Sequence, residues 1–446
     1  MLHLVHTDAL QFDRPIASYW EESATPLQDT FAPLASDESC DVAIVGAGFT
    51  GLNAALELAS SGVDVRVLEA GHIGWGASGR NGGFACFGSH KLSFATLIER
   101  YGKVETRHYY RAMKDAIACV ASNLDEFGID AWKAGDGDLS LAHLPSRMDD
   151  LKAEKDKLED LTGDPAVMLS KEELRQYGCY GPTFHGGMKH PNGFGLHPLN
   201  YVRGLARAVH QRGVKLHPHS RMISWEQSGG LHVLRTAGGS LRAKRVIVAT
   251  NGYTPENISQ HHKGRILPAM SNIIVTRPLT EDERNEQGWT THVMASDSRN
   301  LLHYFRLLPN NRFLFGGRGG TNSSDGGAAT YRARITATFR NMFPRWSNVE
   351  ITHFWRGFVC LSYDKVPYVG ALDDQKTVWT ALAYHGSGVA MGSYSGRAVA
   401  RMMLDKKARD DVPAILTRRL AKFPLPVFRP LYLKGAYMWY GHKDKR

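Results

Sequence analysis

Gly46-Ala47-Gly48-Phe49-Thr50-Gly51 stands between the apolar run Asp41–Val45 and a segment of helical spacing, Leu52–Ala59. This order predicts a strand, a tight turn and a helix. The first glycine of the stretch permits the turn, the second lets the backbone approach a pyrophosphate, and the third lets helix and strand pack closely. The N-terminus of the helix would present its dipole and its N–H groups to the phosphates. The stretch therefore predicts a dinucleotide-binding unit.

A second apolar run follows and ends on an acid. Gly62 stops the helical segment, and Val63–Glu69 has the composition of a strand. Glu69 stands 18 residues after Gly51, where dinucleotide-binding folds place an acid that accepts hydrogen bonds from a ribose hydroxyl. Strand, turn, helix, strand and acid agree, so a chance glycine-rich loop explains the motif poorly.

A glycine-rich run, 74–83 (GWGASGRNGG), comes directly after this unit. Such a run lets backbone amides crowd a flat ligand, while Ser78, Arg80 and Asn81 offer donors to phosphate or ring oxygens. The alternative is a flexible solvent loop. Trp75 within the run favours burial instead.

Composition sets the broad class of the protein. The 446 residues are 43% hydrophobic and 22% charged, which is ordinary for two or three globular domains. Five scattered cysteines without a CxxC pair argue against a disulfide framework or a zinc site and suit a reducing cytoplasm. We see no secretory signal and no apolar run that could span a membrane, so we expect a cytoplasmic location.

The net charge of +10 is concentrated at the C-terminus. Residues 411–446 hold eight Lys and Arg side chains against two Asp, a net charge of +6, together with six aromatic residues. The aromatic residues could pack on the protein's own body, where they could cap the active site, or form a dimer contact. Alternatively, the segment could attach peripherally to the inner membrane. No RNA-binding module accompanies the charge, which argues against a nucleic-acid partner.

Elsewhere the chain alternates strands and helices. Residues 1–36 read as an N-terminal arm, and residues 91–178 as mostly helical, with Asp149–Leu161 as a solvated helix face. The remaining expected strands are Arg245–Ala249, Ile273–Thr276, Phe313–Phe315 and Val378–Leu382, and the remaining expected helices are Asn200–Gln211 and Gly396–Leu404.

Further ordered blocks accompany these motifs: GLHPL at 195–199, ATNGYT at 249–254, WRG at 355–357, Asp364, Pro367 and Gly370, and HGSG at 385–388. Together the blocks resemble the D-amino-acid oxidase, glycine oxidase and sarcosine oxidase superfamily of FAD enzymes. The resemblance is greatest to its γ-glutamylputrescine oxidase-like branch, and it extends to about residue 405.

The resemblance implies an α/β fold (α+β overall) of the glutathione-reductase FAD type: a Rossmann-like FAD-binding domain joined to a mixed-sheet substrate domain. The implied boundaries are 1–36 for the arm, 37–90, 196–255 and 355–405 for the FAD-binding domain, 91–195 and 256–354 for the substrate domain, and 406–446 for the basic aromatic tail.

The resemblance also implies an enzyme that oxidises the C–N bond of an amine. Hydride would pass to flavin N5, the imine would hydrolyse, and O2 or another acceptor would reoxidise the flavin. A γ-glutamylated polyamine, a polyamine, or a secondary amine or amino acid remain open as substrates. One alternative is a membrane-associated amino-acid dehydrogenase that passes electrons to a quinone. Alternatives of another class are an RNA-associated flavoprotein and a flavin-binding protein without turnover.

Two departures from the family pattern narrow the substrate. Val359 stands where D-amino-acid and glycine oxidases place a carboxylate-binding arginine, and Ala390 stands where sarcosine oxidases place a carboxylate-binding lysine. Val and Ala cannot build a carboxylate clamp. We therefore expect a larger amine whose charged end lies further from the reacting nitrogen.

Two sets of site residues follow from the resemblance. The cofactor-binding set is Gly46, Gly48, Thr50, Gly51, Glu69, Ala70, Ser78, Gly79, Arg80, Asn81, Gly82, Gly83, Met222, Ala249, Thr250, Asn251, Gly357, Gly386, Ser387 and Gly388. The candidate catalytic set is Tyr304, Arg318, Tyr384 and His385. No metal site is expected.

Each catalytic candidate has a structural alternative. Arg318 could meet a remote carboxylate or lie on the surface beside a loop. Tyr304 and Arg306 could line the pocket or pack within the sheet. Tyr384 could wall the pocket, while His385 could bond the flavin or be a structural histidine.

Cys360 falls near the position where sarcosine oxidases tether FAD through a cysteine. A buried structural cysteine is the default interpretation, because most members of the closer branch do not tether their flavin. We therefore expect non-covalent FAD.

Overall fold

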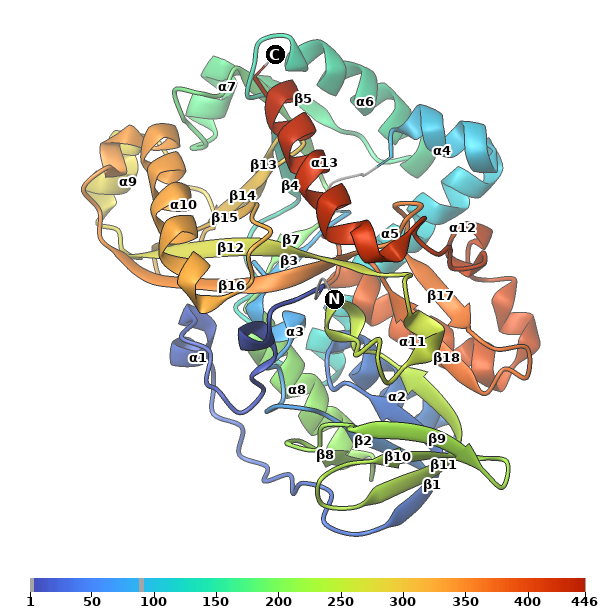
Figure 1. Cartoon of the computed structure of the whole chain (residues 1–446). Coiled ribbons are helices and arrows are strands. Elements are labelled where there is room, and N and C mark those ends of the chain that lie inside the picture. The colour runs from blue at the N-terminus through green and yellow to red at the C-terminus, as the bar shows by residue number, and fades with distance from the viewer. Residues whose placement is uncertain (1–3, 88–91, 446) are drawn as a thin grey trace.

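The computed structural model describes residues 4–87 and 92–445. Within them, two large sheets form the frame of the molecule, one above the other in Figure 1. A short third sheet, β3 (Phe84–Ala85) with β7 (Phe194–Gly195), accompanies them. The mixed α/β architecture confirms the expected fold class.

The first sheet has the order β17-β18-β11-β1-β2-β8, and the ladder β10-β9 is attached to β11. Its strands are β1 (Glu38–Val45), β2 (Val65–Leu68), β8 (Lys215–His217), β9 (Ser224–Ser228), β10 (Leu231–Arg235), β11 (Ser240–Val248), β17 (Tyr368–Ala371) and β18 (Val378–Leu382). The pairs from β18 to β8 are parallel. Parallel strands are buried on both faces, which explains their apolar composition.

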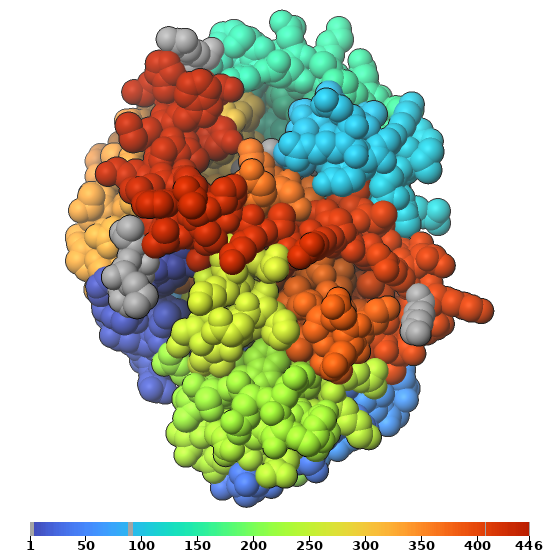
Figure 2. Space-filling view, turned by 45° about the vertical axis from the view of Figure 1, so that its right-hand side comes forward, coloured from blue at the N-terminus to red at the C-terminus, as the bar shows by residue number. Residues whose placement is uncertain are grey.

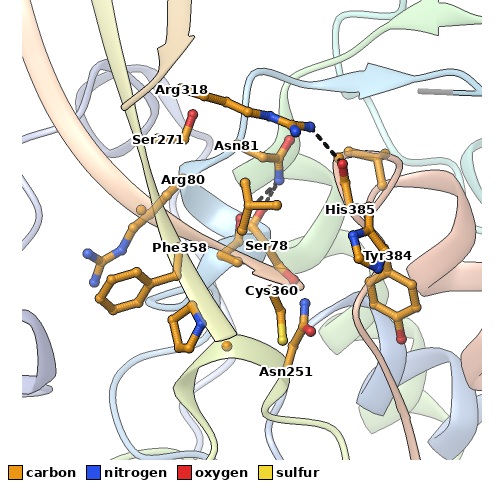
Figure 3. Close-up of a pocket in the computed structure, with 18 of the residues that line it drawn as sticks. Ser78, Arg80, Asn81, Asn251, Ser271, Arg318, Phe358, Cys360, Tyr384 and His385 are labelled. Atoms are coloured by element: carbon orange, nitrogen blue, oxygen red, sulfur yellow. Dashed lines mark hydrogen bonds between the residues drawn. The ribbon is translucent and has the colours of Figure 1, made fainter. Parts of the chain in front are cut away.

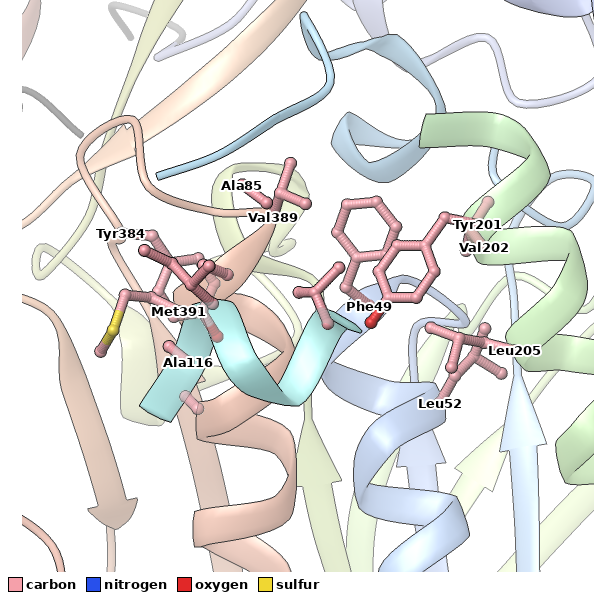
Figure 4. Close-up of a cluster of buried hydrophobic side chains, with 14 of the residues drawn as sticks. Phe49, Leu52, Ala85, Ala116, Tyr201, Val202, Leu205, Tyr384, Val389 and Met391 are labelled. Atoms are coloured by element: carbon pink, nitrogen blue, oxygen red, sulfur yellow. The ribbon is translucent and has the colours of Figure 1, made fainter. Parts of the chain in front are cut away.

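Helices pack beside this sheet and against one another. They are α2 (Phe49–Ser60), α5 (Lys103–Glu126), α8 (Pro198–Gln211) and α11 (Ala390–Leu404). α2 contacts both α8 and α11, and α5 contacts α11. Figure 4 shows Phe49 and Leu52 of α2 meeting Tyr201 of α8, with Met391 of α11 nearby. This apolar cluster fixes the first turn of α2, and the turn before it, against the rest of the body.

The second sheet has the order β16-β12-β15-β14-β13-β4-β6-β5. Its strands are β4 (Asp138–Leu141), β5 (Val167–Ser170), β6 (Gly186–His190), β12 (Leu267–Pro278), β13 (Met294–Asp297), β14 (His303–Leu307), β15 (Arg312–Arg318) and β16 (Ile351–Leu361). Phe305, Phe313 and Phe315 join the separate core that Phe339 and Trp346 complete. Side chains alternate along a strand, so the other face of β14 and β15 is left for the cavity described below.

The remaining helices are short or peripheral. They are α1 (Tyr19–Ser23), α3 (Ala77–Arg80), α4 (Phe94–Tyr101), α6 (Arg147–Thr162), α7 (Lys171–Gln176), α9 (Glu281–Gln287), α10 (Ala328–Met342), α12 (Ala414–Thr417) and α13 (Arg429–Lys443). The 3₁₀ turns are Thr7–Leu10, Asn251–Tyr253, Gln260–His262, Asp325–Gly327, Pro344–Trp346, Lys406–Arg409 and Pro426–Phe428.

The N-terminal arm packs on the rest of the protein, since Trp20 of α1 is fully buried and its Nε1 donates to the backbone oxygen of Asn81 at 2.8 Å. Two expectations need correction. Helix α11, which packs beside the first sheet, begins at Ala390 and not at Gly396. α6 is not simply a solvated face, since Leu158 is buried and Glu154 lines the cavity. The expected domain boundaries stay a prediction.

The C-terminal segment returns to the body as α13, drawn in red in Figures 1 and 2. Pro430 is tolerated in the first turn of α13. Backbone N–H groups there have no acceptor within the helix, so the missing N–H of proline costs no hydrogen bond. Arg429 forms a bidentate pair with Glu256, at 2.6 and 2.7 Å, and the Asp444 carboxylate accepts from the backbone N–H groups of Asn300 and Leu301. Both ends of the helix are therefore held. In the described part of the chain, no helix is long and apolar enough to cross a membrane.

Candidate active site

A cavity of about 1560 Å³ lies between the first βαβ unit and the open face of the second sheet. It exceeds the usual range of roughly 300–1,000 Å³ for a single small-molecule site. Figure 3 shows that its wall includes Ser78 and Asn81 from the glycine-rich run, Ser271 and Arg318 from the second sheet, and His385 from the turn before α11. One cavity thus joins the predicted nucleotide site to the predicted substrate side.

The β1–α2 turn has no room for side chains. Gly46 has a φ of +106°, and a Cβ there would stand 3.0 Å from the backbone oxygen of Ala249. A Cβ on Gly48 would lie 2.7 Å from Oγ of Ser78. The absence of side chains at Gly46 and Gly48 therefore leaves room for a ligand to approach the N-terminus of α2.

Glu69 is placed as a ribose-binding acid would be. Its carboxylate accepts from the N–H of Ala47 at 2.8 Å and from the N–H of Gly71 at 3.1 Å. Burial raises the pKa of Glu69, while these backbone donors pull it down. The two donors hold the carboxylate in place, and its remaining lone pairs suit hydroxyl donors.

The glycine-rich run folds over the same helix terminus. Oγ of Ser78 accepts from the N–H of Phe49 at 3.0 Å, and Nδ2 of Asn81 donates to the backbone oxygen of Ser78 at 2.9 Å. The Arg80 guanidinium lies 4.0 Å over the Trp75 ring, and its Nη2 is buried without a partner among the described residues. An unpaired buried donor at the cavity wall indicates a missing acceptor.

These features fit FAD. A turn that a Cβ would fill, an open helix N-terminus, a fixed carboxylate and an unpaired guanidinium N–H match a dinucleotide with two phosphates and a ribose. Sixteen of the expected cofactor residues line the cavity: Gly46, Gly48, Thr50, Glu69, Ala70, Ser78, Arg80, Asn81, Gly82, Met222, Ala249, Thr250, Asn251, Gly357, Gly386 and Gly388.

The other four expected cofactor residues, Gly51, Gly79, Gly83 and Ser387, lie outside that wall. The glycines among them are needed for packing. A Cβ on Gly51 would stand 1.9 Å from the Gly46 oxygen, one on Gly79 2.0 Å from the Gly74 oxygen, and one on Gly83 1.9 Å from the Leu196 oxygen. These three glycines allow the close backbone packing that gives the predicted nucleotide site its shape.

All four candidate catalytic residues line the cavity. Nη2 of Arg318 donates to the backbone oxygen of His385 at 2.7 Å, drawn as a dashed line in Figure 3. Nε2 of His385 lies 3.0 Å from Oγ of Ser362. The arrangement ties the end of β15 to the turn that precedes α11.

Tyrosine hydroxyls supply neutral hydrogen-bonding groups to the same wall. The Tyr304 hydroxyl lies 2.9 Å from Oγ of Ser271. Burial raises the pKa of Tyr304 to about 12, and burial also raises that of Tyr384. Both hydroxyls therefore keep their protons at neutral pH and can orient a ligand without adding charge.

Arg306 is a structural residue, as the packing alternative proposed. It is almost fully buried and is absent from the cavity wall. Its Nε donates to the backbone oxygen of Gly82 at 3.1 Å, and its Nη2 donates to that of Leu196. Burial lowers the pKa of Arg306 to about 9. The side chain joins the glycine-rich run to the second sheet.

The two clamp positions differ in exposure to the cavity. Val359, on β16, lines it, whereas Ala390 is buried as the first residue of α11 and is absent from the wall. Cys360 lines the cavity as well, and burial raises the pKa of its thiol to about 12. A thiol that stays protonated is a poor nucleophile toward a flavin.

Sequence reasoning missed several titratable residues of the cavity, among them Asp138 on β4, Glu154 on α6 and His190 on β6. None stands in a recognisable motif. Asp138 and His190 meet only through the pairing of β4 with β6. The sequence of neither strand predicts the register of that pairing. Among the described residues, no group of His, Cys, Asp and Glu is arranged to hold a metal ion.

Comparison with known proteins identifies the family of this chain and several of its relatives. The model of the DAO family, described as FAD dependent oxidoreductase, matches residues 41–402. The probable oxidoreductase OrdL of Haemophilus influenzae is 32% identical over 410 residues, covering 89% of this chain and 90% of that protein. Gamma-glutamylputrescine oxidoreductase of Escherichia coli is 29% identical over 440 residues, covering 96% and 98%.

The fold is shared with solved structures. The crystal structure of glycine oxidase from Geobacillus kaustophilus superposes with a TM-score of 0.67 at 20% sequence identity. The superposition covers 82% of this chain and 95% of that one. The fold of this chain is thus one that is known from other proteins.

Proposed function

Because this chain belongs to the DAO family of FAD-dependent oxidoreductases, we propose that it oxidises the C–N bond of an amine that has no carboxylate beside the reacting carbon. The family membership confirms the resemblance drawn from the sequence, with FAD as the cofactor. Bound FAD would take up the hydride of the carbon next to the nitrogen, leaving an imine that water hydrolyses.

One observation carries the proposal. The nucleotide cradle and the polar face formed by Ser271, Tyr304 and Arg318 belong to the same cavity, while Val359 on that wall supplies no charge. A small amino acid needs a bidentate cation for its carboxylate. Arg318 is a cation of that polar face, and its Nη2 already donates to the His385 backbone. The wall is therefore better suited to an amine whose charged end is remote.

The residues of the wall have positioning roles in this proposal. Tyr304 and Ser271 offer a paired hydroxyl donor and acceptor, and Arg318 holds the turn at His385 in place. The Tyr384 hydroxyl closes the cavity beside α2. Fixed neutral hydroxyls and a buried cation orient the amine and exclude water, which is the protein's share of such a reaction.

A substrate panel tests the proposal. Polyamines, γ-glutamylated amines, cyclic imino acids, glycine and D-alanine are offered to the FAD-loaded enzyme with an artificial electron acceptor in place of O2. We expect dye reduction with the amines that lack a nearby carboxylate and little with glycine or D-alanine. Fast turnover of glycine or D-alanine beside inert polyamine derivatives contradicts the proposal.

A second candidate concerns the electron acceptor. One face of α13 packs on the body through Leu433, but Met438 and Trp439 are 70% and 59% exposed. Leu425 and Leu431 are exposed close by. Apolar and aromatic side chains beside lysines suit the surface of an anionic membrane. The exposed face supports peripheral attachment with a quinone as acceptor.

Internal pairing reduces the charge that the tail offers to a partner. Arg429 is paired with Glu256, and Arg418 is paired with Asp364. The attraction to lipid or to nucleic acid is therefore smaller than the net charge of +6 alone indicates. The exposed apolar side chains favour a lipid surface over nucleic acid. Absence of a nucleic-acid partner remains our prediction.

A further inference from the structure

Asp138 and Tyr304 share one face of the second sheet. β4 pairs with β13 and β13 with β14, so Ser140 stands beside Ser296 and Ser296 beside Tyr304. Asp138 lies two residues from Ser140 on β4, so its side chain projects from the same face, and it lines the same cavity. Two strand spacings of about 4.8 Å and one two-residue step of about 6.8 Å place it roughly 12 Å from Tyr304.

The Asp138 carboxyl lacks the partners that acids elsewhere in the chain possess. In the described ranges it forms no ion pair and no side-chain hydrogen bond, and only the N–H of Leu139 approaches it. Burial raises its pKa to about 7. By contrast, Asp136 on the surface nearby accepts from Lys189 at 2.8 Å. A buried acid without a counter-charge is costly to keep, and such groups are concentrated at functional sites.

His190 stands beside Asp138 on the neighbouring strand. Its side chain is only 4% exposed and lines the cavity. Nδ1 accepts from the backbone N–H of Asn192 at 3.3 Å, while the buried Nε2 has no partner within the described chain. Burial lowers the pKa of His190 to about 4, so the ring is neutral at pH 7 and does not repel a cation.

Helix α6 adds further negative charge to the same cavity. Glu154 lines it, and burial, with a smaller contribution from Asp150, raises its pKa. Asp150 is paired with Arg147 at 2.7 Å, whereas Glu154 has no ion pair among the residues that the structure describes. Lys157, also on the wall, is exposed to solvent. Arg147 and Arg299 also line the cavity, and each is paired with an acid of the same wall, Asp150 and Asp297 respectively. Among the described residues, Asp138 and Glu154 are acids of this wall without such a pair.

We propose that Asp138 binds a second positive charge of the substrate, remote from the nitrogen that is oxidised, while the neutral ring of His190 beside it adds no positive charge. Glu154 contributes to the potential that attracts this charge. The inference rests on the proposed function and makes it more specific. The preferred substrate is a diamine, a polyamine, or a derivative of either that keeps a second cation, and a monoamine of the same length is disfavoured.

The experiment compares matched substrates and matched variants of the FAD-loaded full chain. A diamine and a monoamine of equal chain length are assayed by anaerobic flavin reduction, and their binding is measured separately by calorimetry. Asp138→Asn is compared with Asp136→Asn, which makes the same change on the exposed surface. We expect Asp138→Asn to weaken binding of the diamine at least tenfold and that of the monoamine less than twofold. Asp136→Asn should change neither.

An equal loss for both amines would overturn the inference, since Asp138 would then act on the reacting nitrogen or on the fold. Unchanged binding of both would overturn it as well. If neither amine reduces the flavin of the native enzyme, the proposed function fails, while calorimetry still reports on the Asp138 subsite. If Asp138→Asn does not retain FAD, Glu154→Gln is measured in its place. A diamine-specific loss of twofold or more supports the inference, and no loss overturns it.

Discussion

The Tyr384 hydroxyl lies 2.7 Å from Oγ1 of Thr50, although 334 residues separate them in the chain. Thr50 belongs to the first turn of α2, and Tyr384 stands in the turn between β18 and α11. The contact joins the first turn of α2 to the segment that precedes α11, far along the chain. Both residues line the cavity, so the hydrogen bond also closes its wall.

We expect Tyr384→Phe to weaken this closure. Loss of a buried hydrogen bond that leaves one partner unsatisfied lowers the free energy of unfolding by about 1–3 kcal/mol. FAD should dissociate more readily, which fluorescence of the released flavin measures. Tyr363→Phe, on an exposed side chain, is the matched control and should have no effect. Unfolding and FAD release indistinguishable from those of the native protein would contradict this role of Tyr384.

Asp138→Asn should stabilise the protein in a pH-dependent way. The pKa of Asp138 rises from 3.8 to about 7 on folding, so between these values the folded protein holds a proton that the unfolded chain releases. Stability therefore falls as pH rises from about 4 to about 7. Asp138→Asn has no carboxyl group to titrate and does not suffer this loss. Above pH 7 its free energy of unfolding should exceed that of the native protein by at most ~4 kcal/mol, at 1.36 kcal/mol per pK unit.

Melting temperatures of the FAD-loaded proteins at pH 5 and pH 8 measure the effect. The gain from Asp138→Asn should be larger at pH 8 than at pH 5. Asp136→Asn should give no gain, since Asp136 is exposed and paired with Lys189. A variant that is less stable than the native protein at pH 8 would show that Asp138 is satisfied by contacts of the fold.

Cys360 should play no part in holding the cofactor covalently. A thiol with a pKa of about 12 is almost entirely protonated at neutral pH. Acid precipitation of the native protein should leave all of the flavin in the supernatant, and Cys360→Ser should give the same result. A yellow pellet that turns colourless in Cys360→Ser would show a covalent link through this residue.

The exposed face of α13 should bind anionic vesicles at low salt. Met438 and Trp439 lie on the outer side of the helix, and Lys443 follows them. We expect the full chain to sediment with vesicles, and a variant with Met438→Glu and Trp439→Glu to remain in solution. Both changes fall on exposed side chains, so the fold and the cavity are preserved. Equal behaviour of the two proteins would remove the membrane candidate and leave α13 as a structural helix.

The local parts of the site could be predicted from the sequence. The glycine motif and Glu69 lie within one βαβ unit, so their spacing already encodes their juxtaposition. The sequence predicts too late a start for α11, because Gly392, Ser393 and Ser395 have low helix propensity. Tertiary contacts with α2 and α5 stabilise that first turn and override the propensity.

The distal part of the cavity was beyond sequence reasoning. Asp138 and His190 are 52 residues apart in the chain and meet through the pairing of β4 with β6, whose register depends on the whole second sheet. Glu154 stands in a helix rich in charged residues, where only Leu151, Leu158 and Leu161 mark the buried side. A charged residue that faces a cavity looks the same in the sequence as one that faces solvent. Only the assembled sheet distinguishes them.

The proposed function requires FAD in this cavity to accept electrons from an amine without a neighbouring carboxylate. Anaerobic titration of the purified protein with such an amine, followed by absorbance, tests it most directly. We expect one equivalent of a polyamine or γ-glutamylated amine to bleach one equivalent of flavin, with an aldehyde as the product. A flavin that stays oxidised with every amine of the panel, or that is bleached only by glycine or D-alanine, would contradict the claim.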